Sequence, residues 1–124
     1  MEDFKNKYNI EQRKKIFNEL SNNSLLYHIP IIIQKFKKSK LPHLNKWKYL
    51  IEKNINIKEF FKVFNLKLNK KPTETIIFFI DNQKIIFNTL IIINYNHNLK
   101  FLYDKYKNID GFLYIYYCEY NAFG

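Results

Sequence analysis

A run of regularly spaced apolar side chains limits what this 124-residue chain can fold into. The run consists of Ile57, Phe60, Phe61, Phe64 and Leu68. This spacing follows the 3.6-residue period of an α-helix and places all five side chains on one face, so it predicts a helix over residues 57–68. Lys70, Lys71 and Pro72 end the pattern. A helix with one apolar face requires a second apolar surface to cover it.

Short β-branched and aromatic segments flank this helix and are typical of strands. Residues 29–33 and 46–51 precede the helix and predict a hairpin, with Pro30 tolerated near the start of its strand. Residues 76–80 and 112–117 follow the helix and predict two further strands. The chain is therefore expected to form a sheet that packs one face on the helix, an α+β layer arrangement.

The remaining segments predict smaller elements. Residues 4–20 carry apolar side chains among charges and predict one or two short helices. Residues 81–82 (Asp-Asn) are a turn signal, and residues 85–87 predict a short edge strand. The Asn-rich stretch 88–98 is expected to be irregular, and residues 99–106 to form a short helix. In this order the elements predict a ubiquitin-like β-grasp with an N-terminal helical extension.

Three parts of the chain are expected on this basis. Residues 1–26 form an N-terminal helical arm, residues 27–118 a ubiquitin-like domain, and residues 119–124 a flexible tail that leaves the fold. The last residue of the tail is Gly124, one of only two glycines in the chain. A terminal glycine has no side chain, so its carboxyl can thread a narrow channel and meet a nucleophile. Ubiquitin-like modifiers need such a terminus, because the carboxyl is their reacting group.

Charge and cysteine content exclude several classes of protein. The formal net charge is +10, yet Arg13 is the only arginine among 21 basic residues. Specific nucleic-acid recognition favours arginine forks, so we interpret the charge as a solvated surface with general anion affinity. Cys118 is the only cysteine, which excludes a disulfide framework and a thiolate zinc site. No apolar run approaches the ~20 residues of a membrane span, so membrane attachment is expected to be peripheral or covalent.

Several motifs resemble one known family. The segment I-P-I-I-I-Q-K at 29–35 is similar to the segment (I/V)-P-V-I-(V)-E-K of that family. K-W-K-Y-L-I at 46–51 is similar to the family's K-K-K-Y-L-V. F-F-I-D-N at 78–82 resembles the family's F-F-V-N-N, and F-L-Y-I at 112–115 resembles the family's own F-L-Y-I. With the final F-G at 123–124, these matches resemble the autophagy-related protein 8 family, the GABARAP and light-chain-3 type modifiers.

The resemblance implies a modifier rather than an enzyme, with no cofactor, no metal site and no catalytic residue of its own. Activating and conjugating enzymes of the autophagy pathway would join the carboxyl of Gly124 to phosphatidylethanolamine. The product would reside on autophagosome and cytoplasmic vesicle membranes and the unconjugated form in the cytoplasm. Surface lysines would add attraction to an anionic membrane surface.

The resemblance also implies a groove for cargo receptors that carry an aromatic-x-x-aliphatic motif. The second strand should lie at a sheet edge and accept the extended peptide by β-addition. Lys46 and Lys48 would meet acidic residues that flank the motif. The pocket expected to take the aromatic side chain comprises Leu20, Pro30, Leu50 and Phe112. The pocket expected to take the aliphatic side chain comprises Tyr49, Ile51, Ile55, Phe60 and Val63.

Three alternatives remain open from the sequence. The end of the chain also resembles that of the autophagy-related protein 12 family, which forms an isopeptide bond to a protein lysine instead of a lipid amide. An unconjugated basic module that binds nucleic acid or membranes is a second alternative, since a basic groove with aromatic side chains binds single strands. A cysteine–histidine enzyme built from Cys118 and one of His28, His43 or His97 is a third.

Overall fold

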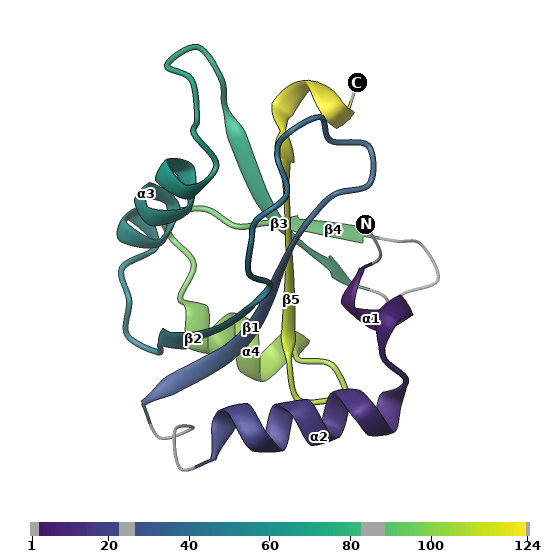
Figure 1. Cartoon of the computed structure of the whole chain (residues 1–124). Helices are drawn as coiled ribbons and strands as arrows, with labels where there is room; N and C mark the ends of the chain where they lie inside the picture. Colours follow the sequence, from purple (N-terminus) through teal and green to yellow (C-terminus); the bar gives the residue numbers. More distant parts are fainter. Residues whose placement is uncertain (1–2, 23–26, 83–88, 124) are drawn as a thin grey trace.

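The structure of the chain is a computed structural model that describes residues 3–22, 27–82 and 89–123 (Figure 1). It contains a mixed five-stranded sheet with helices on both faces. The elements in chain order are α1 (Phe4–Lys7), α2 (Ile10–Ser21), β1 (His28–Lys35), β2 (Lys48–Glu52), α3 (Ile57–Lys67), β3 (Ile76–Asn82), β4 (Thr89–Ile92), α4 (Leu99–Tyr106), β5 (Leu113–Glu119) and the 3₁₀ turn η1 (Tyr120–Phe123).

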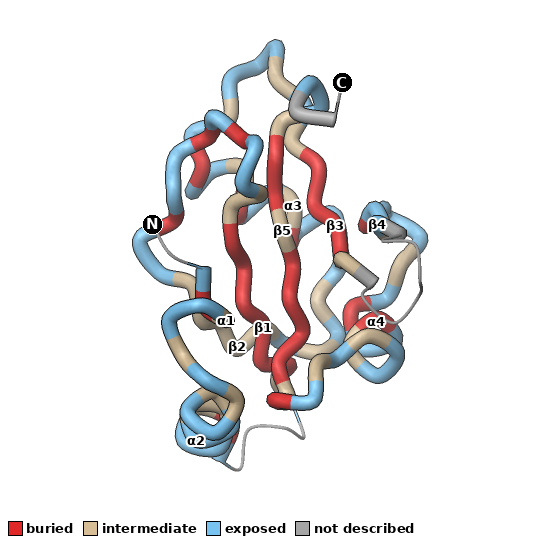
Figure 2. Tube along the Cα trace, turned by 90° about the vertical axis from the view of Figure 1, so that its right-hand side faces the viewer, coloured by how far each residue is buried: buried red, intermediate tan, exposed pale blue. Residues whose placement is uncertain are grey.

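The strand order in the sheet is β2-β1-β5-β3-β4. β1 and β5 run parallel at the centre, and each other neighbouring pair is antiparallel. These two central strands are buried along most of their length (Figure 2). The predicted hairpin of β1 and β2 is confirmed, and β2 lies at one edge of the sheet as predicted.

An asparagine or aspartate side chain caps the start of each α-helix in the described ranges. Asn9 accepts a hydrogen bond from the Gln12 N–H, and the Gln12 side chain accepts one from the Asn9 N–H, at 2.8 and 2.9 Å. Asp3, Asn56 and Asn98 cap α1, α3 and α4 in the same way. Each cap satisfies N–H groups that lack a partner inside the helix, which fixes where the helix begins.

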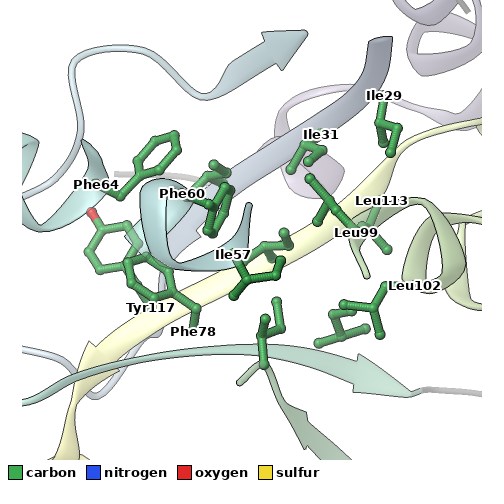
Figure 3. Close-up of a cluster of buried hydrophobic side chains, with 14 of the residues drawn as sticks. Ile29, Ile31, Ile57, Phe60, Phe64, Phe78, Leu99, Leu102, Leu113 and Tyr117 are labelled. Atoms are coloured by element: carbon green, nitrogen blue, oxygen red, sulfur yellow. The ribbon is translucent and has the colours of Figure 1, made fainter. Parts of the chain in front are cut away.

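The main core lies between one face of the sheet and helices α3 and α4 (Figure 3). The predicted face of α3 supplies Ile57, Phe60 and Phe64, and Leu68 follows the last turn of the helix. These residues meet alternate side chains of the strands, because successive residues of a strand point to opposite faces. The strands contribute Ile29, Ile31, Ile33, Phe78, Ile80, Leu113, Ile115 and Tyr117.

The N-terminal helices cover part of the opposite face of the sheet (Figure 1). Phe4 of α1 packs edge-on against Phe112, at 5.5 Å between ring centroids. Phe17 of α2 also packs edge-on against Phe112, at 5.6 Å between ring centroids. The N-terminal helical extension therefore has its own apolar cluster, which also contains Ile32 and Tyr114.

Two predictions around the second half of the sheet are wrong. Residues 81–82 do not turn but continue β3, where Asp81 pairs with Leu90. The stretch 88–98 is not irregular throughout, because Thr89–Ile92 forms the edge strand β4 and Ile93 is buried in the main core. Pairing with β4 overrides the local turn preference of Asp81 and Asn82. The edge strand predicted at residues 85–87 lies outside the described residues.

The last strand also extends further than predicted. Glu119, expected to open the tail, is the final residue of β5 and pairs with Ile76. The Tyr120 N–H then donates to the Thr75 C=O at 2.9 Å, and residues 120–123 form the 3₁₀ turn η1. Within the described part of the chain, the segment beyond the sheet thus begins at Tyr120.

Candidate functional site

The edge strand β2 presents backbone hydrogen-bonding groups on its outer side. The Ile33 N–H donates to the Trp47 C=O, and the Lys53 N–H to the Tyr27 C=O, both at 2.9 Å. The odd-numbered residues of β2 therefore bond to β1, since bonding alternates along an antiparallel pair. The N–H and C=O groups of Lys48 and Leu50 consequently point away from β1. They are placed to bond an added strand.

The two predicted pockets lie on opposite faces of β2. Tyr49 and Ile51 point to the face that carries α3, where both pack against the main core. Leu50 alternates to the other face and pairs directly with Pro30. The structure therefore places the predicted aromatic pocket on the side of α2 and the predicted aliphatic pocket on the side of α3.

The α3 side of β2 combines covered and open apolar side chains. Phe60 is 0% exposed, so it belongs to the core and forms no part of an open surface. Ile51 and Ile55 are half-buried, and Val63 is 41% exposed. Leu66, one helical turn from Val63, is 71% exposed and was not among the predicted site residues. Its i, i+3 spacing from Val63 is the sequence signal that identifies it as a neighbour.

Tyr49 is held in a fixed orientation beside this surface. Its ring lies edge-on to Phe64 at 5.1 Å, and its hydroxyl donates to the Lys46 C=O at 2.7 Å. The Lys46 ammonium lies 5.2 Å from the centroid of the same ring. Burial raises the pKa of the Tyr49 hydroxyl, so Tyr49 is neutral at physiological pH. Lys46 is exposed and Lys48 half-buried, which leaves the basic rim of β2 open to acidic partners.

The α2 side of β2 is more closed than predicted. Phe112 is 0% exposed, because Phe4 and Phe17 cover it. Pro30 is also buried, whereas Leu20 and Leu50 remain half-buried. Leu20 packs against the same cluster as Phe112, so the structure brings these two predicted residues together. Phe112 and Pro30 are therefore covered, and only Leu20 and Leu50 of the predicted aromatic pocket remain partly accessible.

Trp47 is a neighbour of this second cluster that the site prediction did not include. It packs against the cluster of Phe4 and Phe112, and its ring lies edge-on to Phe4 at 6.4 Å. The Lys7 ammonium lies 5.4 Å from the Trp47 ring. Cation–π contacts of this kind add about 0.5–1 kcal/mol at exposed sites. Trp47 thus links α1 to the segment that leads into β2.

The root of the C-terminal segment lies at the far end of the sheet from α2 (Figure 1). Tyr120 is 67% exposed, so the chain leaves β5 at the molecular surface. Gly124, the predicted conjugation residue, lies outside the described residues.

A separate cavity of about 650 Å³ lies between the N-terminal helices and the turn after α4. Both positive and negative side chains line it, among them Lys5, Arg13, Asp81 and Lys105. At its edge Arg13 forms an ion pair with the buried Asp110. Among the residues with described positions, no cluster of three or more His, Cys, Asp or Glu side chains is arranged to hold a metal ion.

Cys118, the nucleophile of the cysteine–histidine alternative, is not exposed at the surface of the described structure. Cys118 is buried in β5, and burial raises the pKa of its thiol to about 11. A thiol needs a lowered pKa and access to substrate to act as a nucleophile.

Among the helices in the described ranges, none is long and apolar enough to cross a bilayer.

Comparison with known proteins matches residues 12–124 to the family model described as autophagy protein Atg8, ubiquitin like. Autophagy-related protein 8 of Dictyostelium discoideum is 30% identical over 121 residues, covering 98% of this chain and 93% of the relative. Autophagy-related protein 8 of Pichia angusta is 31% identical, covering 98% and 90%. The crystal structure of Trypanosoma brucei ATG8 superposes with a TM-score of 0.80 at 20% identity, covering 97% of this chain and 96% of that one.

The chain has a mixed sheet with a helix across its main face, and it shares this architecture with the Atg8 structure. It is therefore a ubiquitin-like α+β protein with N-terminal helices, which confirms the predicted fold class. The family match covers far more than half of the chain, and relatives at 30% identity or more span nearly all of it. The chain belongs to the Atg8 family of ubiquitin-like autophagy proteins. This confirms the family resemblance drawn from its motifs.

Proposed function

We propose that this protein is a modifier that is conjugated through Gly124 to phosphatidylethanolamine. The observation that carries the proposal is the family match, which extends through residue 124 and so includes Gly124. The exposed Tyr120 at the root of the tail supports it, because a reacting terminus needs a path away from the body of the fold. The Gly124 carboxyl would be adenylated, pass through enzyme thioesters and form an amide with the lipid amine.

The lipid would supply membrane attachment without a membrane-spanning helix, and none of the described helices is long and apolar enough to span a bilayer. Each buried CH₂ group contributes about 0.8 kcal/mol, so two acyl chains anchor stably where one does not. The net charge of +10 adds attraction to anionic membranes. We therefore propose autophagosome and vesicle membranes as the site of the conjugated form, the cytoplasm as that of the free form, and the autophagy activating and conjugating enzymes as its partners.

The test of conjugation is reconstitution with the host's activating and conjugating enzymes and phosphatidylethanolamine liposomes. In intact-mass measurement wild type should gain the mass of one lipid less one water, and it should float with the liposomes, whereas Gly124→Ala should do neither. Asn121→Ala, which changes an exposed residue of the same segment, is the matched control and should react like wild type. A product with the mass of a protein–protein conjugate would instead support the protein-linked alternative.

A peptide groove along β2 is the second part of the proposed function. The outward backbone groups of Lys48 and Leu50 support β-addition, and apolar side chains flank the strand on both faces. Leu20 and Leu50, above Pro30 and Phe112, would receive the aromatic side chain of the peptide. The aliphatic side chain would meet Tyr49, Ile51, Ile55 and Val63, with Phe60 beneath them. Lys46 and Lys48 would attract acidic flanks.

Titration with an acidic aromatic-x-x-aliphatic peptide tests this groove. The double variant Lys48→Glu, Leu50→Ala should abolish measurable binding, because it reverses a rim charge and removes one apolar wall. Ile109→Ala is the control, since this residue is exposed in the turn after α4 and belongs to neither pocket. Equal affinity of the double variant and wild type would exclude the groove while leaving the conjugation proposal intact.

A further inference from the structure

The last residue of β5 is joined by its side chain to the loop that follows β1. The Ser39 Oγ donates to a Glu119 carboxylate oxygen at 2.9 Å. The Lys40 N–H lies 3.2 and 3.3 Å from the two Glu119 oxygens and shares its hydrogen between them. The Ser39 Oγ also accepts from the Leu41 N–H at 3.1 Å. We call Ser39, Lys40 and Glu119 the tail clamp.

The loop side of the tail clamp is itself fixed to the sheet. The Phe36 N–H donates to the Tyr117 C=O at 2.9 Å, and the Tyr117 hydroxyl donates to the Pro42 C=O at 2.8 Å. The Lys35 ammonium donates to the Ser39 C=O at 3.0 Å. Ser39 is buried, so water competes poorly for its hydroxyl. Hydrogen bonds to a carboxylate are roughly twice as strong as neutral ones, so Glu119 is held firmly.

This clamp fixes the C-terminal end of β5 against the loop that follows β1. Four residues lie between Glu119 and Gly124, and they form the turn η1 (Tyr120–Phe123). Without the clamp, the edge of β5 at Glu119 would retain only backbone bonds. Fraying of that last pair, Glu119 with Ile76, would loosen the attachment of η1 to the sheet and lengthen the segment beyond it.

We propose that Glu119 is a positioning residue for the reaction at Gly124, acting through Ser39 and Lys40. This inference rests on the proposed conjugation. The clamp keeps the point where the chain leaves the sheet fixed relative to the ubiquitin-like body, which the activating enzyme would hold at the same time as the tail. Removing the clamp adds conformational freedom that binding must then restrict, which raises KM while the adenylation chemistry itself is unchanged.

The experiment measures kcat and KM of the activating enzyme for wild type, Glu119→Ala, Glu119→Gln, Ser39→Ala and the double variant Ser39→Ala, Glu119→Ala. We expect Glu119→Ala to raise KM by about three- to tenfold, the equivalent of one net hydrogen bond, with kcat within about twofold. Glu119→Gln keeps an acceptor and should recover part of the loss. The double variant should be no worse than Glu119→Ala, because both changes break one interaction.

Asp110→Asn is the control for a loss of stability, since it alters a buried ion pair remote from the tail and should leave KM unchanged. Asn121→Ala controls for a change beyond the clamp and should also leave KM unchanged. If wild type is adenylated and conjugated while Glu119→Ala has the same KM, the clamp has no positioning role and the conjugation proposal stands. Additive losses in the double variant would likewise overturn the inference. A wild type that the enzymes do not conjugate would overturn the proposed function first.

Discussion

The guanidinium of Arg13 in α2 lies 2.9 Å from the carboxylate of Asp110 in the turn before β5. Asp110 is buried and also accepts hydrogen bonds from the Tyr114 hydroxyl and from the Phe112 N–H. Its carboxylate is therefore satisfied by three donors from two parts of the chain. This interaction attaches the N-terminal helical arm to the ubiquitin-like sheet, on the face opposite α3.

Arg13→Ala should destabilise the protein by about 2–4 kcal/mol, because it leaves the Asp110 carboxylate buried without its cation. The measurement is the free energy of unfolding in urea. Lys100→Ala is the matched control, since Lys100 pairs with Asp104 at 2.7 Å but both side chains are about half exposed. Exposed pairs contribute about 0–1 kcal/mol. Equal losses from the two variants would contradict the role assigned to Arg13.

Gly111→Ala should destabilise the fold by about 2 kcal/mol or more. Gly111 has φ of +99°, where L side chains are strained, and a Cβ there would lie 2.6 Å from the Phe17 ring. Combining it with Phe17→Leu should recover the part of the loss that comes from the contact and leave the backbone part. Asn69→Gly is the control, because Asn69 has φ of +53° and glycine relieves that conformation. The measurement is thermal unfolding of wild type and the three variants. A Gly111→Ala variant that melts at the wild-type temperature would contradict the strain assigned to Gly111.

The fold was predictable where the chain has a clear period or local turn chemistry. The apolar spacing of Ile57 to Leu68 defined α3 to within one residue, since the helix ends at Lys67 and Leu68 follows it in the core. β4 was missed because Asp81 and Asn82 favour a turn locally, whereas their strand pairs with Thr89–Ile92 across the structure. The Arg13–Asp110 ion pair has no local signal, because 97 positions separate its residues.

The candidate groove was only partly predictable for a related reason. An apolar pattern identifies which side chains leave water but not which of them remain partly open. Phe60 and Phe112 were expected to line pockets and instead lie in the core. Strand alternation does separate Tyr49 and Ile51 from Leu50, so the division of the two pockets between the faces of β2 follows from the sequence once β2 is known.

The division of the pockets predicts selective coupling with a bound peptide. Leu50→Ala should weaken an aromatic-x-x-aliphatic peptide about tenfold, and should have little further effect once the peptide's aromatic residue is alanine. Ile51→Ala should couple in the same way to the aliphatic residue, since it lies on the α3 face. Affinities from calorimetry complete the two double-mutant cycles. Equal coupling of each variant to both peptide positions would show that one shared pocket binds both side chains.

Stability should fall at alkaline pH because of the buried hydroxyl of Tyr117. Burial raises the pKa of this hydroxyl to about 12, and the hydroxyl donates to the Pro42 C=O. The unfolded chain loses the same proton near pH 10, so the folded state binds it more tightly between these values. The resulting stability is fully present below pH 10 and is lost as the pH rises towards 12.

The measurement is the free energy of unfolding in urea at intervals from pH 8 to 12. Tyr117→Phe should be less stable than wild type at pH 8 by about 1 kcal/mol, because it lacks the hydrogen bond to Pro42. The free energy of unfolding of Tyr117→Phe should then decline less steeply with rising pH than that of wild type. The remaining pH dependence should come from groups such as Tyr116, whose pKa burial also raises to about 12. Tyr120→Phe is the control, since its hydroxyl lies on an exposed side chain and the wild-type slope should remain. A parallel decline of Tyr117→Phe and wild type would show that the Tyr117 proton is not held more tightly in the folded state.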